Sequence, residues 1–328
     1  MPKGLLERLA EGPVLGDGGY LLELEKRGYV QAGPFTPEVS LTQPRALAEL
    51  HREYLHAGAE VLQALTFYAS EDKLATVGLS GKVDEINRAA VEVARAVAAE
   101  GDALVAGNLS LTWAYDPADP ASFDRVRGLL DRQLEVQMDV GIDLVVCETF
   151  SYLGEALIAL DRARLTGLPV VVTMCFEADP RSYEGDSPAE CAHRLEAAGA
   201  DVVGVNCLRN PGTTLPLVTE MREAVSCHVA SQPTAYRTPP EQPDFTALPE
   251  FPHALDPLQL TRGEMGDYAA RAKELGVGYI GSCCGSVACH VKAMAKALGK
   301  LPAEERRWRI DYERPMSAYE YYRHTETA

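Results

Sequence analysis

The sequence lacks three features that would assign it to large classes of proteins. Basic residues are few, with 31 Lys and Arg against 48 Asp and Glu and a formal net charge of −17, and no basic patch with interleaved aromatic residues occurs. This argues against nucleic acid as a partner. The longest apolar runs, such as residues 168–176, are far too short to span a bilayer. The opening residues carry charges among their apolar positions, unlike a secretory signal. We therefore expect a soluble, cytoplasmic protein that binds no membrane.

The composition is otherwise that of a globular protein. Hydrophobic residues make up 46% of the 328 residues and charged residues 24%, which predicts a substantial buried core. This length suits two ordinary domains or one large α/β barrel. The order of the predicted helices and strands distinguishes these two architectures.

Apolar, β-branched runs alternate with helix-length segments almost to the C-terminus. The spacing of apolar residues at three and four positions predicts helices, for example over residues 43–59, 83–101 and 187–200. Eight runs are predicted to be strands, at residues 13–19, 59–66, 102–110, 142–149, 169–176, 201–207, 228–233 and 277–284.

Eight strand–helix units predict a closed, parallel (β/α)8 TIM barrel of the α/β class, formed as a single domain over residues 1–300. An open, doubly wound sheet is the alternative, but no GxGxxG phosphate-binding motif follows the first strand. A proline-rich connection at residues 234–257 is predicted to cover a functional region. Residues 301–328 are predicted to be an appendage that packs on the barrel or on a neighbouring subunit, which leaves a homo-oligomer open.

Three of the eight cysteines fall where a barrel carries its chemistry, at the C-terminal ends of strands. Cys207 ends the sixth predicted strand, and Cys283 and Cys284 end the eighth, between Gly281 and Gly285. Three thiolates on one rim suit a tetrahedral Zn²⁺ whose fourth position stays open to substrate. The flanking glycines would let both adjacent sulfurs face one ion.

The other five cysteines lie in or beside strand-like runs. We interpret them as small buried hydrophobic residues, since cysteine often has that role in a reducing compartment. They are Cys147, Cys175, Cys191, Cys227 and Cys289.

Two carboxylates are predicted at the same rim. Asp17 follows the first strand and Glu148 ends the fourth. Each could cap a helix or a turn, but an acid that closes an apolar strand is expected to point into the barrel mouth. Beside a zinc ion, the two acids would bind an ammonium group or act as catalytic bases.

Aromatic residues also follow these strands. Phe35 lies in the predicted loop at residues 31–38, Tyr68 follows the second strand, and Trp113 and Tyr115 follow the third. Loop aromatics usually pack on their own loops. Several on one rim could instead enclose a quaternary cation through the negative faces of their rings.

Long stretches of the chain resemble one enzyme family. The segments "DGGYLLELEKRGYVQAGPFTPE", "TFYASEDKL", "GVNC", "LPEFP" and "GSCCG" are similar to those of the betaine–homocysteine S-methyltransferases, within the zinc-dependent homocysteine S-methyltransferases. The similarity runs from about residue 14 to about residue 300. It implies a methyl transfer from glycine betaine to homocysteine, which yields methionine and dimethylglycine.

The resemblance also implies roles for individual residues. The zinc ligands fall on Cys207, Cys283 and Cys284. Homocysteine would be held by Asp17, Gly18 and Glu148, and the methyl donor by Phe35 and Tyr68.

The chain departs from the family at two donor positions. The betaine enzymes usually carry tryptophan where this chain has Phe35 and tyrosine where it has Thr149. Trp113 or Tyr115 would refill the space if betaine is the donor. The first alternative keeps the chemistry but uses a sulfonium donor such as S-methylmethionine or dimethylsulfoniopropionate. A more remote alternative is a non-catalytic protein whose thiols bind zinc or sense oxidants.

Overall fold

The computed structural model describes residues 3–30 and 36–301 of the chain. Eight strands form one parallel sheet in the order β1-β8-β7-β6-β5-β4-β3-β2. Each overlaps one of the eight predicted runs, and β4 extends one residue beyond its run. The strands are β1 (Val14–Leu15), β2 (Val61–Gln63), β3 (Leu104–Ser110), β4 (Leu144–Phe150), β5 (Val170–Met174), β6 (Val202–Asn206), β7 (His228–Gln232) and β8 (Tyr279–Ile280).

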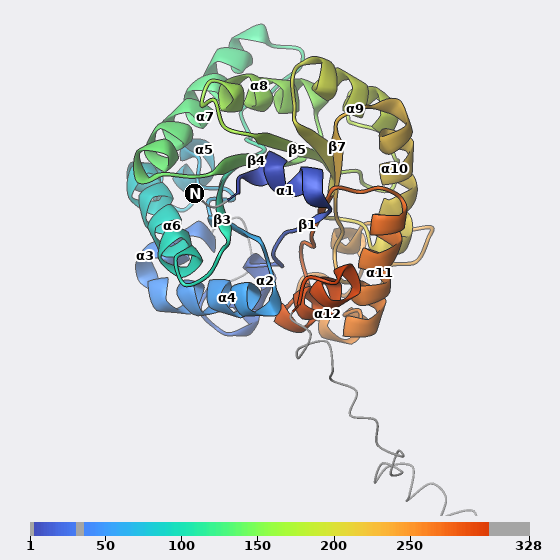
Figure 1. The fold of residues 1–328 in the computed structure, drawn as a ribbon. Helices are drawn as coiled ribbons and strands as arrows, with labels where there is room; N and C mark the ends of the chain where they lie inside the picture. The colour runs from blue at the N-terminus through green and yellow to red at the C-terminus, as the bar shows by residue number, and fades with distance from the viewer. Residues whose placement is uncertain (1–2, 31–35, 302–328) are drawn as a thin grey trace, which may run out of the picture.

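The sheet closes on itself. β1 pairs with β8, with Leu15 opposite Ile280, and on its other side the backbone N–H of Glu60 donates to the carbonyl of Leu15 at 2.8 Å. Figure 1 shows the strands at the centre of a ring of helices. The prediction of a (β/α)8 barrel is confirmed, and the open sheet is excluded.

The helices that surround the sheet follow from the amphipathic patterns in the sequence. In α6, Val83, Ile86, Ala90 and Val97 recur at helical spacing and are buried. The α-helices are α1 (Leu5–Glu11), α2 (Leu21–Lys26), α3 (Val39–Thr42), α4 (Pro44–Ala57), α5 (Glu71–Ala75), α6 (Val83–Ala98), α7 (Pro120–Val140), α8 (Leu153–Arg164), α9 (Pro188–Ala197), α10 (Pro211–Ala224), α11 (Arg262–Glu274) and α12 (Ala288–Leu298).

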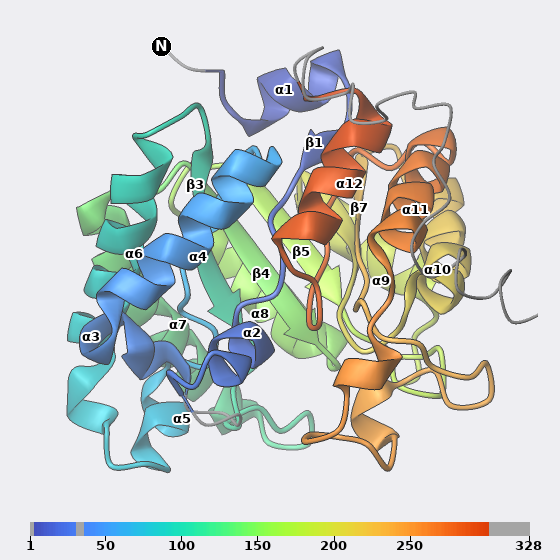
Figure 2. The ribbon, with the colours of Figure 1, turned by 90° about the horizontal axis from the view of Figure 1, so that it is seen from below.

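The interior of the barrel is apolar at one end and polar at the other. At the N-terminal ends of the strands, Leu5 and Leu9 of α1 pack against inward-facing strand residues such as Val61 and Val146. Figures 1 and 2 show α1 lying across this end of the barrel. At the opposite end, Asn108, Glu148 and other polar side chains are buried. The polar residues of the strands are thus concentrated at the C-terminal rim of the barrel.

The long connection between β7 and α11 covers part of this rim. It contains the short 3-10 helices η3 (Phe245–Ala247) and η4 (Asp256–Leu258), and its Tyr236, Phe245 and Leu255 pack in a cluster with Cys207. The remaining 3-10 helices are η1 (Thr36–Glu38) and η2 (Ser80–Lys82). The predicted appendage at residues 301–328 falls almost entirely outside the described residues.

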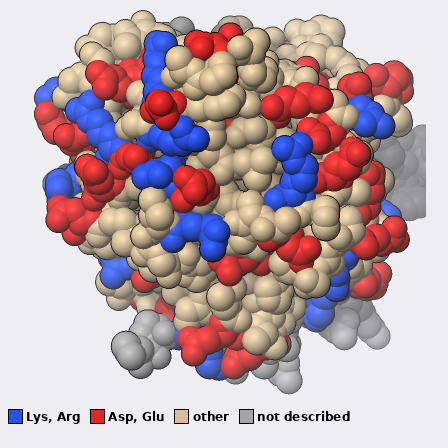
Figure 3. Space-filling view, turned by 90° about the horizontal axis from the view of Figure 1, so that it is seen from above, with Lys and Arg blue, Asp and Glu red and all other residues tan. Residues whose placement is uncertain are grey.

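Acidic and basic side chains are intermixed on the surface. Figure 3 shows them side by side on one face, without a basic patch on that face. Among the described helices, none combines the length and the apolar character that a membrane span requires.

Candidate active site

Strained backbone marks the C-terminal rim of the barrel. Among the described residues, four that are not glycine have a positive φ angle, and all four follow or end a strand at this rim. They are Tyr68, Thr149, Cys207 and Leu208, with φ between 52° and 64°. Such conformations persist only where the surrounding structure enforces them, and they cluster at functional sites.

Three cysteine thiols meet at this rim. The sulfur atoms of Cys207, Cys283 and Cys284 all lie within 4.8 Å of one another, with Cys207 and Cys284 3.7 Å apart and Cys283 and Cys284 4.0 Å apart. Gly285 provides the bend that was expected beside them, with φ +78° and no room for a Cβ against the ring of Tyr236. Gly281 has no positive φ, and a Cβ there would lie 3.1 Å from Cγ of Gln232.

The three thiols influence one another's ionisation. Hydrogen bonding with Cys283 and Cys284 holds the pKa of Cys207 well below its usual range, and the pKa values of Cys283 and Cys284 are raised in turn. A cation at the centre of the cluster would allow all three to ionise, because it removes their mutual repulsion.

Glu148 lies beside the thiols in a nearly complete hydrogen-bond shell. Its Oε1 accepts from Gln63 Nε2 at 2.7 Å and from Asn108 Nδ2 at 2.8 Å, and its Oε2 accepts from Asn206 Nδ2 at 3.1 Å. Burial, and to a smaller extent the charge of Cys207, raises the pKa of Glu148 to about 7. A buried carboxylate of this kind favours a cationic partner.

Asp17 occupies the same side of the rim. Its Oδ2 accepts from the backbone N–H of Gln63 at 2.8 Å and from the hydroxyl of Tyr20 at 2.5 Å. Burial raises its pKa to about 7 as well. Gly18 is required for a steric reason, since a Cβ there would lie 2.7 Å from a ring carbon of Tyr54.

The aromatic residues predicted for the donor pocket do not all come together. The rings of Tyr68 and Trp113 are neighbours, with centroids 6.3 Å apart. Tyr115 instead stacks on Phe123 with a centroid distance of 5.4 Å, and its hydroxyl donates to Glu184. Phe35 lies outside the described residues.

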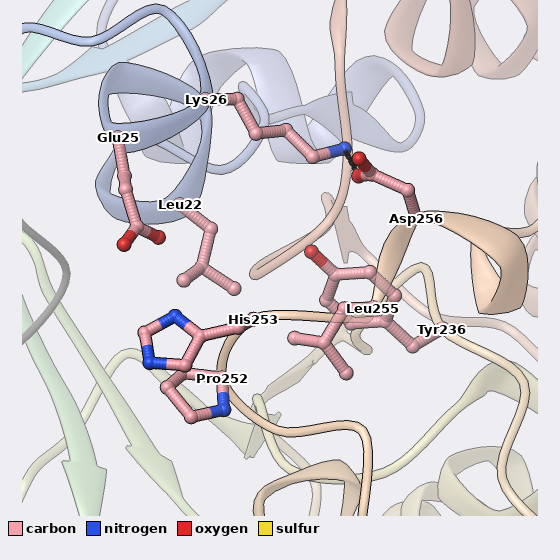
Figure 4. A pocket seen from close by; sticks show the side chains of 8 residues that line it. All are labelled: Leu22, Glu25, Lys26, Tyr236, Pro252, His253, Leu255 and Asp256. Carbon is pink, nitrogen blue, oxygen red and sulfur yellow. Dashed lines mark ion pairs between the residues drawn. The ribbon is translucent and has the colours of Figure 1, made fainter.

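A pocket opens between α2 and the connection from β7 to α11 (Figure 4). Its volume is about 190 Å³, and Lys26 and Asp256 form an ion pair at its edge. Leu22, Tyr236 and Leu255 line it and belong to the same packed cluster as Cys207. The three thiols do not themselves line this opening.

The remaining cysteines separate into two groups. Cys147, Cys175 and Cys191 are buried, as predicted, and burial raises the pKa of each thiol. Cys227 is only partly buried and Cys289 is exposed, so the prediction of a buried thiol is wrong for Cys289. That residue lies near the start of α12 and faces away from the core.

Several residues at the site were not identified from the sequence. Gln63, Asn108 and Asn206 hold Glu148, and Tyr20 holds Asp17. The signal was present for the two asparagines, because each interrupts an otherwise apolar strand near its C-terminal end.

The fold and this rim define a class of protein: a (β/α)8-barrel enzyme whose active site joins clustered thiols to buried carboxylates. The family model for homocysteine S-methyltransferases matches residues 14–298. The chain belongs to this family, and it is a methyltransferase.

Individual relatives agree with this assignment. Betaine–homocysteine S-methyltransferase 1 of Danio rerio is 46% identical over 305 residues, which covers 90% of this chain and 76% of the relative. The Bos taurus protein of the same name is 45% identical over 311 residues, with 90% and 75% covered. The metallated form of the homocysteine methyltransferase MmuM from Escherichia coli has a TM-score of 0.71 at 20% identity, with 88% of this chain and 98% of that chain covered, and it supports the fold alone.

Proposed function

We propose that this enzyme transfers a methyl group from glycine betaine to homocysteine, and that Cys207, Cys283 and Cys284 hold a zinc ion for this reaction. The observation that carries the proposal is the meeting of these three sulfur atoms within 4.8 Å of one another beside Glu148. Relatives that are 45–46% identical and are named betaine–homocysteine S-methyltransferase 1 support betaine as the donor.

The donor set fits zinc. Zn–S bonds of about 2.3 Å in a tetrahedral site place the sulfur atoms about 3.8 Å apart. The separations of 3.7 Å and 4.0 Å are close to this value. When bound, zinc would lower the pKa of an incoming homocysteine thiol, so that the sulfur is a thiolate at neutral pH.

The carboxylates of this chain suit the amino end of homocysteine. Asp17 and Glu148 are both held by Gln63 and are near enough for the charge of Asp17 to raise the pKa of Glu148. An ammonium group between them would favour the ionised form of both acids. In this arrangement they position the substrate, and neither has to move a proton during methyl transfer.

The reaction itself balances without an acid or a further cofactor. The sulfur of homocysteine attacks a methyl carbon of betaine, the C–N bond breaks, and its electron pair stays on the nitrogen of dimethylglycine. Charge is partly neutralised in this step, so the exclusion of water by the buried rim lowers the barrier. In-line placement of sulfur and methyl group supplies a further share of the rate.

The proposal is tested by methionine formation with purified, zinc-loaded enzyme across a panel of donors. Turnover with betaine supports it, and turnover with S-methylmethionine or dimethylsulfoniopropionate alone would replace betaine with a sulfonium donor. Zinc binding without turnover for any donor would support the non-catalytic alternative. A cytoplasmic location remains part of the proposal, since all eight cysteines are free thiols.

A further inference from the structure

Lys73 is a buried basic residue with no acidic partner in direct contact among the described residues. The residue lies in α5, has no solvent exposure, and its Nζ has no hydrogen-bond partner among the described residues. A buried ammonium without a hydrogen-bond acceptor or a counter-ion is costly, because contacts with aromatic rings offset only part of the water that it has lost. Such a group is expected to receive an anion when the site is filled.

The ammonium of Lys73 lies over two of the aromatic rings that the sequence predicted for the methyl-donor pocket. Its Nζ lies 3.6 Å from the ring centroid of Trp113 and 4.1 Å from that of Tyr68. These cation–π contacts hold the lysine in place. A second cation on the same ring faces would be repelled by the first, so the methylated ammonium of a donor has to lie elsewhere.

The acids nearest to Lys73 are engaged with other donors. Asp72 accepts from the hydroxyl of Ser70 and from the backbone N–H of Trp113 at 2.6 Å. Oε1 of Glu155 accepts from the backbone N–H and the hydroxyl of Thr112, at 2.7 Å and 2.6 Å. Burial lowers the pKa of Lys73 to about 7 despite both acids. The arrival of a carboxylate would raise it again.

Tyr68 connects this lysine to the reacting end of the site. One face of its ring meets Lys73, and the pKa of its phenol is raised first by burial and then by the neighbouring cysteines, Cys207 foremost. Tyr68 is therefore a neighbour of the lysine and lies within electrostatic reach of the thiols. In betaine, a single methylene group separates the carboxylate from the methylated nitrogen.

We propose that Lys73 receives the carboxylate of the methyl donor and so selects donors that carry one. This inference rests on the proposed function and adds to it the group that recognises the negative end of betaine. Tyr68 and Trp113 then hold the lysine, and the donor's methylated end points from Lys73 toward the thiols.

The test compares two sulfonium donors that differ only in the carboxylate. Dimethylsulfonioacetate carries one and trimethylsulfonium does not, while both present the same electrophilic methyl group. Lys73→Met keeps the length of the side chain and removes its charge. We expect kcat/KM for dimethylsulfonioacetate and for betaine to fall by about 10- to 150-fold, mainly through KM, because a charged hydrogen bond of about 1.5–3 kcal/mol is lost. Trimethylsulfonium should change by less than about 3-fold.

Two controls separate this role from a structural one. Lys82→Met removes an exposed lysine that pairs with Glu85, and it should leave both donors unchanged. Zinc content and the melting temperature show whether Lys73→Met is folded, and binding of dimethylglycine to the homocysteine-loaded variant gives a readout without turnover.

Each outcome decides the question. An equal loss for both sulfonium donors in Lys73→Met, or an unchanged ratio between them, would overturn the role of Lys73 and leave betaine as donor. Wild-type turnover of dimethylsulfonioacetate but not of betaine would overturn betaine as donor. The ratio of kcat/KM between the two sulfonium donors would still test the role of Lys73.

Discussion

Gln63 donates its side-chain amide to Oε1 of Glu148 at 2.7 Å from the end of β2. Its backbone N–H reaches Asp17 at 2.8 Å, so one residue fixes the distance between the two acids of the site. The acids come from the ends of strands at different positions around the barrel, so their separation depends on this residue.

Glu148→Gln should weaken homocysteine binding. The substitution removes the charge and replaces one acceptor oxygen by an NH2 group, which faces either the donors Gln63 and Asn108 or the donor Asn206. We expect the KM for homocysteine to rise by about 10- to 150-fold, as for the loss of a charged hydrogen bond, with a much smaller effect on the KM for betaine. Steady-state kinetics with each substrate varied in turn measures this. Glu85→Gln, at an exposed ion pair, is the control, and an unchanged KM in Glu148→Gln would refute the role of the acid.

Asp17→Asn should stabilise the substrate-free protein at high pH. Burial raises the pKa of Asp17 from 3.8 to about 7, so the folded state holds this proton more tightly than the unfolded state does. The ionised side chain therefore costs stability above pH 7, and the cost disappears as the pH falls from 7 toward 4.

The comparison needs denaturant unfolding of both proteins at pH 5 and pH 8. The gain in unfolding free energy from Asp17→Asn should be larger at pH 8, by on the order of a few kcal/mol. Any loss of the hydrogen bond from Tyr20 is the same at both pH values and cancels in the difference. A gain that is equal at the two pH values, or larger at pH 5, would contradict the raised pKa.

Cys284→Ala should abolish tight zinc binding, whereas Cys289→Ala should not. Cys284 belongs to the thiol cluster, and Cys289 is an exposed thiol five positions further along the chain. We expect about one zinc ion per chain in Cys289→Ala and the wild type, and methionine formation only in those two proteins. Elemental analysis after dialysis measures the metal. Zinc retained by Cys284→Ala would place the ion elsewhere.

Thr149→Asn should stabilise the fold. Thr149 has φ +64°, which a β-branched residue adopts at a cost of about 1–2 kcal/mol, while asparagine tolerates this conformation better. Its side-chain carbonyl can still accept from Asn206, as the hydroxyl of Thr149 does at 2.7 Å. We expect the unfolding free energy to rise by about 0.5–1.5 kcal/mol. A decrease would show that the threonine methyl group is needed for packing.

The order of the elements could be predicted from the sequence because parallel strands, buried on both sides, leave uninterrupted apolar runs. The same rule predicted where Cys207, Cys283 and Glu148 lie, since the ends of such runs meet at one rim. Burial of single side chains was harder to predict. Cys289 follows the apolar β8 segment but begins a new helix, and its exposure depends on which face of that helix meets α11.

Lys73 shows why the rest of the site could not be predicted. In the sequence it is one charged residue among "SEDKL", a composition typical of a solvated first turn. Its burial comes from Tyr68 and Trp113, which reach it from two other loops. Gln63 is equally inconspicuous, because a glutamine at the end of a strand is as common at surfaces as it is in active sites. Contacts of this kind exist only once the barrel has closed.

The proposed function requires a zinc ion that three thiols hold and to which homocysteine adds a fourth ligand. X-ray absorption at the zinc edge of the purified enzyme measures the number of sulfur ligands directly. We predict three sulfur ligands at about 2.3 Å in the free enzyme and four after homocysteine is added. A sulfur count that homocysteine leaves unchanged, or zinc bound mainly through nitrogen and oxygen, would contradict the central claim.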